Sequence, residues 1–300
     1  MKLFLRRAFL FVLTGCTFLA KAQGQTTPGK PSTDGIRCSR FEWNAGKSVM
    51  RVPITVNGQH YWYQLDTGAD VVIPYGAKEH AGWTEKSSFT RAPRVQFAGM
   101  FFSSIPVYRM KNIPDKDLQG SVGLDILVGH TFVIDFPRQR ICLMNRADLP
   151  DALNRAADWI PAQIRDGKLF LSAELNGQKL PDLIYDSGDS PDELSVDFDL
   201  WKAATNLKGA EDTATHQVDQ IWGKEVESVT AKSTGDLRLG QHTYSHPVLS
   251  TTPSRPNFFR DNVFGASGSL GNALFFSSIV ILDLGSHPQF GVVSPSSTEH

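Results

Sequence analysis

Two short segments of the sequence place an aspartate directly before a small hydroxyl residue and a glycine. They are YQLDTGAD, residues 63–70, and IYDSGDS, residues 184–190. A single Asp-Ser/Thr-Gly triplet carries little weight, because chance supplies one in roughly one chain in seven of this length. Two carboxylates held about 3 Å apart are more informative, since they cannot both ionise and must share a proton. One of them can then take a proton from water while the other donates a proton to a carbonyl oxygen.

The two triplets lie in matching surroundings. Residues 54–70, ITVNGQHYWYQLDTGAD, resemble residues 172–190, SAELNGQKLPDLIYDSGDS. Each segment has an apolar strand, the same Asn-Gly-Gln turn and a second strand before the triplet. Asn-Gly is a strong hairpin signal because both residues tolerate positive φ. Two equivalent β-hairpins are therefore expected to deliver Asp66 and Asp186 to equivalent places.

The repeat continues downstream of both triplets. GSVGLDILVGHTFVIDFPRQRI, residues 120–141, aligns without a gap on GSLGNALFFSSIVILDLGSHPQ, residues 268–289. A further matched pair of strand segments, each with a Gly-centred turn, lies at residues 95–110 and 237–250. The sequence therefore predicts an all-β protein made of two similar halves.

These motifs, in this order, resemble those of the aspartic peptidase superfamily, which includes pepsin-like and retropepsin-like enzymes. QLDTGAD and IYDSGDS resemble its two active-site loops, and GSVGLDIL and GSLGNALF resemble the hydrophobic-hydrophobic-glycine segment that follows each loop. The resemblance covers most of residues 41–293 and is closest to exported bacterial proteins with two fused retropepsin-like halves. It implies a bilobal acid-protease fold, with two pseudo-twofold-related β-barrel-like lobes and a cleft between them.

The resemblance also assigns the site residues. Asp66 and Asp186 would form a catalytic dyad that activates a water to hydrolyse a peptide bond, with no metal and no other cofactor. The hydroxyl residue of each triplet would tie the two loops together, and each glycine would let the backbone approach the carboxylates closely. These supporting residues are Thr67, Gly68, Ser187 and Gly188. The expected function is that of an aspartic endopeptidase acting on peptide or protein substrates.

The second half has 28 more residues than the first between its triplet and its glycine loop. Much of this surplus falls in residues 214–231, two alternating runs around Ile-Trp-Gly-Lys that indicate a hairpin. The resemblance makes the hairpin a substrate-binding flap over residues 217–227, with Trp222 and Gly223 near its tip; an exposed surface hairpin is the alternative. The counterpart in the first half, residues 83–91, is too short for a full flap.

The residue after the second triplet departs from the family pattern, in which this residue is usually small. Ala69 fits the pattern and Asp189 does not. If Asp189 is ionised and close to the dyad, its charge should hold the shared proton to higher pH and move the activity optimum from strongly toward mildly acidic. Two alternatives stay open. In the first, the second half keeps the fold but lacks the chemistry, and the chain is a catalytically inactive peptide-binding module. In the second, Asp66 pairs with its own copy in a homodimer.

The first 22 residues predict export. Three basic residues precede a mainly apolar run of about 13 residues, and Ala-Lys-Ala at 20–22 offers a cleavage site, as in a secretory signal peptide. The run is too short to span a bilayer comfortably. The protein would be periplasmic or secreted, although LTGC resembles a lipobox and leaves open a lipoprotein anchored through Cys16. The other two cysteines, Cys38 and Cys142, are an even pair that invites a disulfide in an exported protein.

Composition and charge exclude several classes of protein. At 41% hydrophobic and 20% charged residues, the chain has the composition of an ordinary globular protein and not of a fibre. Without residues 1–22 the formal charge is −5, so neither nucleic acid nor an anionic membrane is expected as a partner, and we expect a monomer.

The predicted organisation is a signal peptide (1–22), a flexible tether (23–36), an N-terminal protease-like lobe (37–147), an interlobe linker with a short helix capped by Asp148 or Asp151 (148–168), a C-terminal protease-like lobe (169–295) and a tail (296–300).

Overall fold

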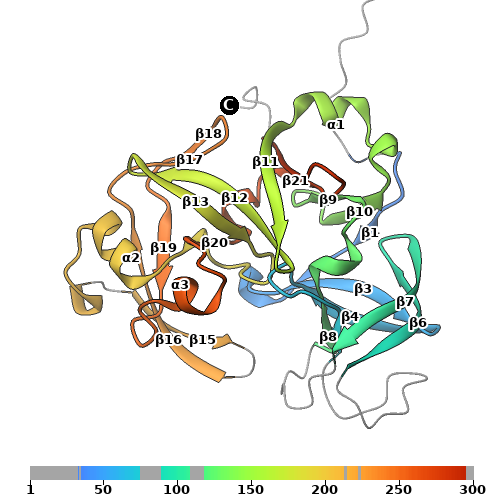
Figure 1. Cartoon of the computed structure of the whole chain (residues 1–300), viewed down its shortest axis with the longest axis horizontal. Coiled ribbons are helices and arrows are strands. Elements are labelled where there is room, and N and C mark those ends of the chain that lie inside the picture. Colours follow the sequence, from blue (N-terminus) through green and yellow to red (C-terminus); the bar gives the residue numbers. More distant parts are fainter. Residues whose placement is uncertain are drawn as a thin grey trace, which may run out of the picture. The chain divides into compact units, whose positions relative to one another are not determined.

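The computed structural model describes Thr33 and residues 35–74, 89–108, 118–212, 215–221 and 224–294. Within these residues the regular structure is mostly β-strand, which confirms the all-β expectation (Figure 1). The α-helices in the described ranges are short: α1 (Asp151–Ala156), α2 (Phe198–Thr205) and α3 (Phe258–Asn262). No helix of the described chain has the length and apolar character needed to cross a membrane. The predicted signal peptide and C-terminal tail lie outside the described residues.

A seven-stranded sheet carries the first triplet. Its strands are β2 (Glu42–Trp43), β3 (Met50–Val56), β4 (Gln59–Leu65), β5 (Ile73–Pro74), β6 (Phe89–Phe97), β7 (Met100–Tyr108) and β8 (Gly120–Val122). The order is β5-β8-β4-β3-β6-β7, with β2 paired to β3. β3 and β4 form the predicted hairpin, and Asn57 and Gly58 take left-handed φ values of 51° and 84° at its turn. Fully buried residues alternate along β3, so one face of this sheet lies on the core.

The same arrangement of strands carries the second triplet. Its strands are β12 (Lys168–Leu175), β13 (Gln178–Tyr185), β14 (Leu194–Ser195) and β20 (Gly268–Leu270). β12 and β13 form a hairpin around Asn176 and Gly177, which are also left-handed. β13 pairs in parallel with β20, just as β4 pairs in parallel with β8, at equivalent positions of the sequence repeat. Asp66 and Asp186 therefore follow the ends of two equivalent strands.

The two halves share one sheet. It contains β1 (Ser39–Arg40), β9 (Thr131–Asp135), β10 (Arg140–Met144), β11 (Asp158–Arg165), β21 (Ile279–Asp283) and β22 (Gln289–Val293). The order is β1-β10-β9-β21-β22-β11, and β9 and β21 pair antiparallel with Val133 opposite Ile281. Every residue of β9 and β21 is buried, so core strands and not surface loops join the halves.

The segment between the halves contains more structure than its sequence suggests. Residues 148–168 are predicted to be a linker with one short helix, but β11 lies there as well and pairs with β22 and β12. Pro161 within β11 argues against a strand at the sequence level, because proline cannot donate to the ladder. The predicted helix is α1, but Pro150 occupies its N-cap and no side chain caps it. Capping by Asp148 or Asp151 is therefore wrong.

The N-terminal part of the described chain is fastened to the shared sheet. Cys38 and Cys142 form a disulfide, and β1 pairs with β10 next to it. Thr33 is fully buried, and its hydroxyl donates a hydrogen bond of 2.6 Å to Asp135. The prediction places Thr33 inside a flexible tether, residues 23–36, but the structure fixes this residue to the shared sheet.

A long hairpin extends the second half at the position predicted for it. β15 (Thr215–Ile221) pairs antiparallel with β16 (Lys224–Lys232), and β16 pairs with β19 (Val248–Thr251). Trp222 and Gly223 lie outside the described residues, as does most of the first-half counterpart, residues 83–91. A smaller hairpin joins β17 (Leu237–Leu239) and β18 (His242–Tyr244). Single-turn 3₁₀ helices lie at Ala45–Lys47, Leu124–Ile126, Arg146–Asp148, Ala210–Asp212 and Ala273–Phe275.

Removal of the disulfide should destabilise the folded chain strongly. Cys38 and Cys142 are 104 residues apart, and closing a loop of about 100 residues stabilises a protein by roughly 4–5 kcal/mol in the chain-entropy account. We expect the Cys38→Ser, Cys142→Ser double variant to lose about 3–5 kcal/mol of unfolding free energy in guanidinium titrations. A reductant should lower the midpoint of the wild type but not that of the double variant. Equal midpoints for oxidised and reduced wild type would contradict this expectation.

Candidate active site

Two equivalent strand ends bring Asp66 and Asp186 together. The backbone N–H of Asp66 donates to the carbonyl of Val122, and that of Asp186 donates to the carbonyl of Leu270, both at 3.0 Å. These bonds extend the parallel pairings of β4 with β8 and of β13 with β20 by one residue. The two carboxyl groups interact directly through a hydrogen bond, and the Asp66 side chain lies almost entirely below the surface, with 8% of the residue exposed.

The hydroxyl residues of the two triplets tie the loops to each other. The N–H of Thr67 donates to Ser187 Oγ at 3.0 Å, and the N–H of Ser187 donates to Thr67 Oγ1 at 2.9 Å. Thr67 Oγ1 in turn donates to the carbonyl of Tyr185 at 2.9 Å. Both hydroxyl residues are fully buried. This reciprocal exchange fixes the distance between the halves at the point where the aspartates meet.

The glycines of the triplets are required by close approach and not by a positive φ. Gly68 donates its N–H to Asp186 Oδ1 at 3.1 Å, and Gly188 donates to the same oxygen at 2.8 Å. A Cβ on Gly188 would lie 2.7 Å from Asp66 Oδ1, and a Cβ on Gly68 would overlap the Asp186 carboxylate. Ala69, one residue after the first triplet, donates its N–H to Asp66 Oδ1 at 3.0 Å. Asp186 thus accepts two loop N–H groups on one oxygen, whereas Asp66 accepts one.

The surroundings of the two carboxyl groups favour a proton on Asp66 and a negative charge on Asp186. Burial, followed by the charge of Asp186, raises the pKa of Asp66 well above its usual value. Burial also raises the pKa of Asp186, but the N–H groups of Gly188 and Gly68 and the hydrogen bond from Asp66 oppose this rise. Hydrogen bonds to the ionised form favour ionisation, so the negative charge is placed on Asp186. The titration belongs to the pair, because the two groups interact strongly.

A lysine from the second half reaches the loop that carries Asp66. Lys168 Nζ forms an ion pair with Asp70 Oδ1, and the lysine side chain is only 12% exposed. The preceding Gly167, in the β11–β12 turn, approaches Asp70 so closely that a Cβ there would lie 2.7 Å from the carboxyl carbon. The charge of Lys168 lowers the pKa of both dyad carboxyls. Nothing in the local sequence marks this role, because the contact joins residues 98 apart.

Asp189 is held away from an ionised state. Its Oδ2 accepts a hydrogen bond from Ser195 Oγ at 2.8 Å, and its carboxyl group interacts with that of Asp192. Burial, followed by the charges of Asp192 and Asp186, raises the pKa of Asp189 well above its usual value. The raised pKa favours the protonated form of Asp189 in acidic solution. The expected upward shift of the activity optimum assumed an ionised Asp189, so this direction runs against that assumption, and the shift itself stays a prediction.

A buried polar network supports the second loop from behind. Asn272, which is fully buried, accepts a hydrogen bond from the Tyr185 hydroxyl at 2.8 Å. Its amide nitrogen donates to the Ser187 carbonyl at 3.0 Å and to Ser190 Oγ at 2.7 Å. The repeat places Leu124 at the same position of the first half. The network was not predicted, although a polar residue after the second glycine loop, where the first half has leucine, was a signal for it.

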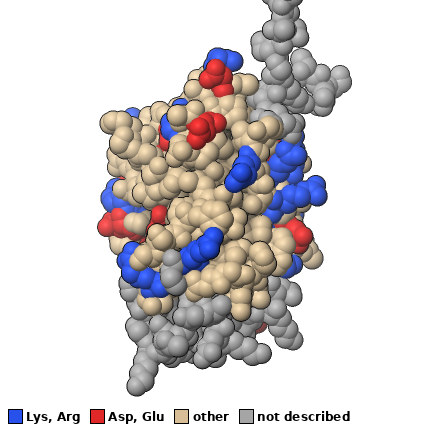
Figure 2. Space-filling model, turned by 90° about the vertical axis from the view of Figure 1, so that its right-hand side faces the viewer, with Lys and Arg blue, Asp and Glu red and all other residues tan. Residues whose placement is uncertain are grey.

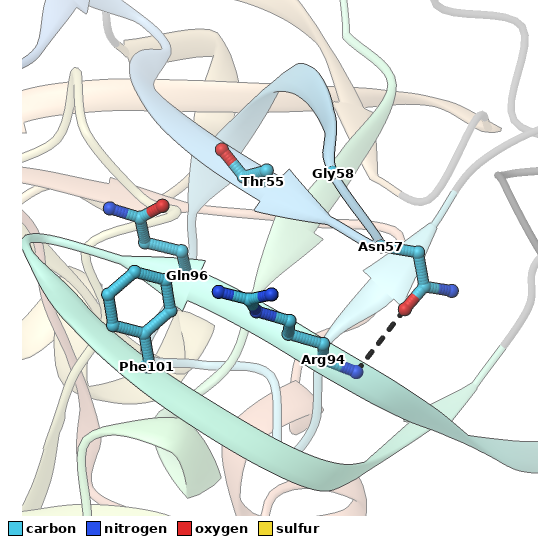
Figure 3. A pocket seen from close by; sticks show the side chains of 6 residues that line it. All are labelled: Thr55, Asn57, Gly58, Arg94, Gln96 and Phe101. Carbon is cyan, nitrogen blue, oxygen red and sulfur yellow. Dashed lines mark hydrogen bonds between the residues drawn. The ribbon is translucent and has the colours of Figure 1, made fainter.

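A hollow in the first sheet does not belong to this site. It measures about 390 Å³ and lies at the Asn57–Gly58 turn, between β3 and the β6–β7 hairpin (Figure 3). Figure 3 shows the backbone N–H of Arg94 donating to the Asn57 side chain, at 3.2 Å. The turn is the far end of the hairpin from Asp66, roughly 20 Å away along the seven residues of β4.

The structure brings together six of the predicted site residues and leaves others unplaced. The six are Asp66, Thr67, Gly68, Asp186, Ser187 and Gly188. The predicted flap residues Trp222 and Gly223 lie outside the described residues. No protein-family model matches the chain, and no curated protein matches it either.

Replacement of Asp189 should change how stability depends on pH. A carboxyl group whose pKa is higher in the folded state than in the unfolded state stabilises the fold while it is protonated. This stabilisation is complete below the ordinary aspartate pKa of about 4 and is lost as the pH rises through the pKa of the folded state. Asp189→Asn cannot ionise and can still accept the bond from Ser195. As the pH rises from about 4 toward neutral, the variant should therefore lose less unfolding free energy than the wild type, as measured in guanidinium titrations. The exposed Asp236 provides the matched control, Asp236→Asn. A wild-type pH dependence in Asp189→Asn would argue against a raised pKa of Asp189.

Replacement of Lys168 should make the dyad harder to deprotonate. Lys168→Met keeps most of the side-chain length and removes the charge that lowers the pKa of Asp66 and Asp186. We therefore expect both apparent pKa values of the pair to rise, as followed by carboxyl-carbon NMR titration. Lys179→Met, at an exposed position of β13, should leave the titration unchanged. Identical titrations for Lys168→Met and the wild type would show that Lys168 does not act on the dyad.

Proposed function

We propose that the chain is an aspartic endopeptidase whose dyad is formed within one chain by Asp66 and Asp186. The observation that carries the proposal is the direct contact of the two carboxyl groups, held between two loops that exchange hydrogen bonds through Thr67 and Ser187. Two adjacent carboxyl groups whose surroundings favour the proton on one of them can act as one acid and one base toward water.

The proposal includes the bilobal acid-protease fold with a cleft above the dyad. It is supported by the two matched hairpins, by the parallel strand that follows each of them, and by the sheet that the halves share. In this arrangement each half supplies one aspartate, and neither half is complete without the other. The internal dyad makes a monomer sufficient for activity.

The two carboxyls would have different roles in the reaction. Asp186, which carries the charge, would take a proton from water as the water oxygen attacks the carbonyl carbon of the peptide bond. Asp66 would give its proton to the carbonyl oxygen, so the dyad stays singly protonated and a tetrahedral diol forms. When the diol collapses, one of its hydroxyl protons returns to Asp66. Asp186 then gives its proton to the leaving nitrogen as the C–N bond breaks. No covalent bond forms between substrate and protein.

The hairpin of β15 and β16 is the proposed flap. All of β15 pairs with β16, and β16 is anchored through its second half to β19. An extended peptide offers backbone N–H and carbonyl groups that a hairpin of this kind binds by strand addition. The tip residues Trp222 and Gly223 stay a prediction as contacts to substrate.

Cleavage of a random peptide library between about pH 3 and pH 7 tests the proposal. The variants are Asp66→Asn and Asp186→Asn, which keep the side-chain shape, and the control is Asp236→Asn at an exposed position. Each dyad variant should lose at least about 10³-fold in kcat/KM, because each group acts in proton transfer. The control should cleave like the wild type.

The same experiment separates the alternatives. A wild type that binds a transition-state-mimicking peptide, yet cleaves nothing, would contradict the endopeptidase proposal and identify an inactive peptide-binding module. Loss of cleavage in Asp66→Asn alone would contradict the internal dyad in favour of a homodimer. Circular dichroism of each variant would show that a loss of cleavage is not a loss of fold.

A further inference from the structure

One side chain of the first half is hydrogen-bonded to the loop that carries Asp186. Gln64 lies on β4, two residues before Asp66, and its Nε2 donates to the carbonyl of Gly188 at 3.1 Å. Because a carbonyl oxygen can only accept, the amide nitrogen of Gln64 and not its amide oxygen faces Gly188. The bond is partly buried and joins residues that are 124 apart in the sequence. It therefore links the two halves of the chain beside the two aspartates.

The equivalent side chain of the second half cannot make the reverse bond. Ile184 lies on β13 two residues before Asp186, which is the position that Gln64 has before its own aspartate. An isoleucine side chain has no polar hydrogen to donate. Ile184 is buried and belongs to an apolar cluster with Phe170 and Phe259. The sequence repeat thus contains an amide donor in one half only at this position.

The bond from Gln64 holds one end of a peptide group whose other end is also held. The carbonyl of Gly188 and the N–H of Asp189 belong to the same planar peptide group. Gln64 binds the carbonyl, and the N–H of Asp189 donates to the carbonyl of Asp186 at 3.1 Å. Glycine allows a wide range of backbone conformations, so this peptide group would turn easily without both bonds. Fixing it also restricts the N–H of Gly188 itself, which donates to Asp186 Oδ1 at 2.8 Å.

The matching peptide group of the first half has a different arrangement of hydrogen bonds. The N–H of Ala69 donates both to the carbonyl and to Oδ1 of Asp66, each at 3.0 Å. One donor is therefore divided between two acceptors, in a three-centre bond. In the second half the N–H of Asp189 binds the carbonyl of Asp186, and the N–H of Gly188 binds its carboxylate. The carboxylate of Asp186 thus has a donor that the backbone carbonyl does not share.

The distribution of charged residues would by itself favour the opposite placement of the negative charge. Residues 37–147, which include Asp66, contain 14 Lys and Arg against nine Asp and Glu, whereas residues 169–295, which include Asp186, contain eight against 16. The side where β6 and β7 lie in Figure 1 faces the viewer in Figure 2, and it shows Lys and Arg at more places than acidic residues. Salt screens surface charges over about 10 Å. The N–H of Gly188 acts at 2.8 Å, so the local hydrogen bonds decide.

We propose that Gln64 is a positioning residue that makes the two aspartates unequal, because its bond to Gly188 keeps an N–H donor on the carboxylate of Asp186. The side chain acts through the Gly188 peptide group and not on the reacting atoms. Its consequence for catalysis rests on the proposed peptidase function, whereas its effect on the two carboxyl groups does not. In the proposed reaction, this bond keeps the negative charge on the group that takes a proton from water.

Carboxyl-carbon NMR titration of protein labelled at the aspartate Cγ atoms tests the proposal. Gln64→Met keeps the length of the side chain and removes the donor. Burial raises the pKa of Asp186 and the N–H of Gly188 opposes that rise, so the lower apparent pKa of the pair should increase in this variant. The upper value should change little, because Asp186 is already ionised before the second proton leaves. Lys168→Met should differ by raising both values. Gln178→Met, at an exposed position of β13, is the matched control and should titrate like the wild type.

A second variant separates the donor from the space that the side chain fills. Gln64→Glu is mostly protonated at about pH 3, below the ordinary glutamate pKa of about 4.3, and then keeps one O–H that can donate to the carbonyl of Gly188. At this pH the backbone amide chemical shifts of Gly188 and Asp189 should match the wild type in Gln64→Glu and differ from it in Gln64→Met. Equal shifts in the two variants would contradict a role as donor. Circular dichroism would show that each variant is folded.

The titration and the kinetics have separate outcomes. An unchanged titration in Gln64→Met, or an equal rise of both apparent pKa values, would overturn the proposal. If the wild type cleaves peptides, Gln64→Met should lower kcat about tenfold and leave KM nearly unchanged, because proton transfer is impaired and substrate binding is not. A higher KM with an unchanged kcat would instead show that Gln64 binds substrate, against a positioning role. A wild type that cleaves nothing would count against the peptidase function alone, since the titration needs no substrate.

Discussion

The repulsion between two adjacent carboxyl groups is the constraint on which the structure around Asp66 and Asp186 depends. Two aspartates that were both ionised at this separation would push the halves apart, so the pair keeps a proton and the remaining charge must be stabilised. The loop N–H groups supply that stabilisation, and they reach the carboxylates only because Gly68 and Gly188 have no side chain. The exchange between Thr67 and Ser187 then prevents the loops from separating. The shared sheet of β9 and β21 does the same on a larger scale.

The repeat makes the two halves equivalent in position, but their differences give the two aspartates different roles. Asp186 receives two N–H donors on one oxygen, and Asp66 receives one. The second loop rests on the hydrogen-bonded amide of Asn272, where the first half has the apolar Leu124. Lys168 crosses from the second half and pairs with Asp70 beside the first loop. Unequal surroundings separate the proton affinities of the pair, which is the condition for one acid and one base.

Much of the fold could be predicted from local signals. Asn57–Gly58 and Asn176–Gly177 specify their hairpins because the turn needs two left-handed residues, and the repeat aligns everything that follows. The all-β class follows from the same evidence. β11 could not be predicted, because Pro161 argues against a strand at the sequence level. The strand forms because it pairs with β22, which is far away in the sequence, and with β12. The ion pair of Lys168 with Asp70 and the raised pKa of Asp189 were not predicted, for a related reason. Both depend on which groups burial brings together, and a pattern of residue types does not contain that information.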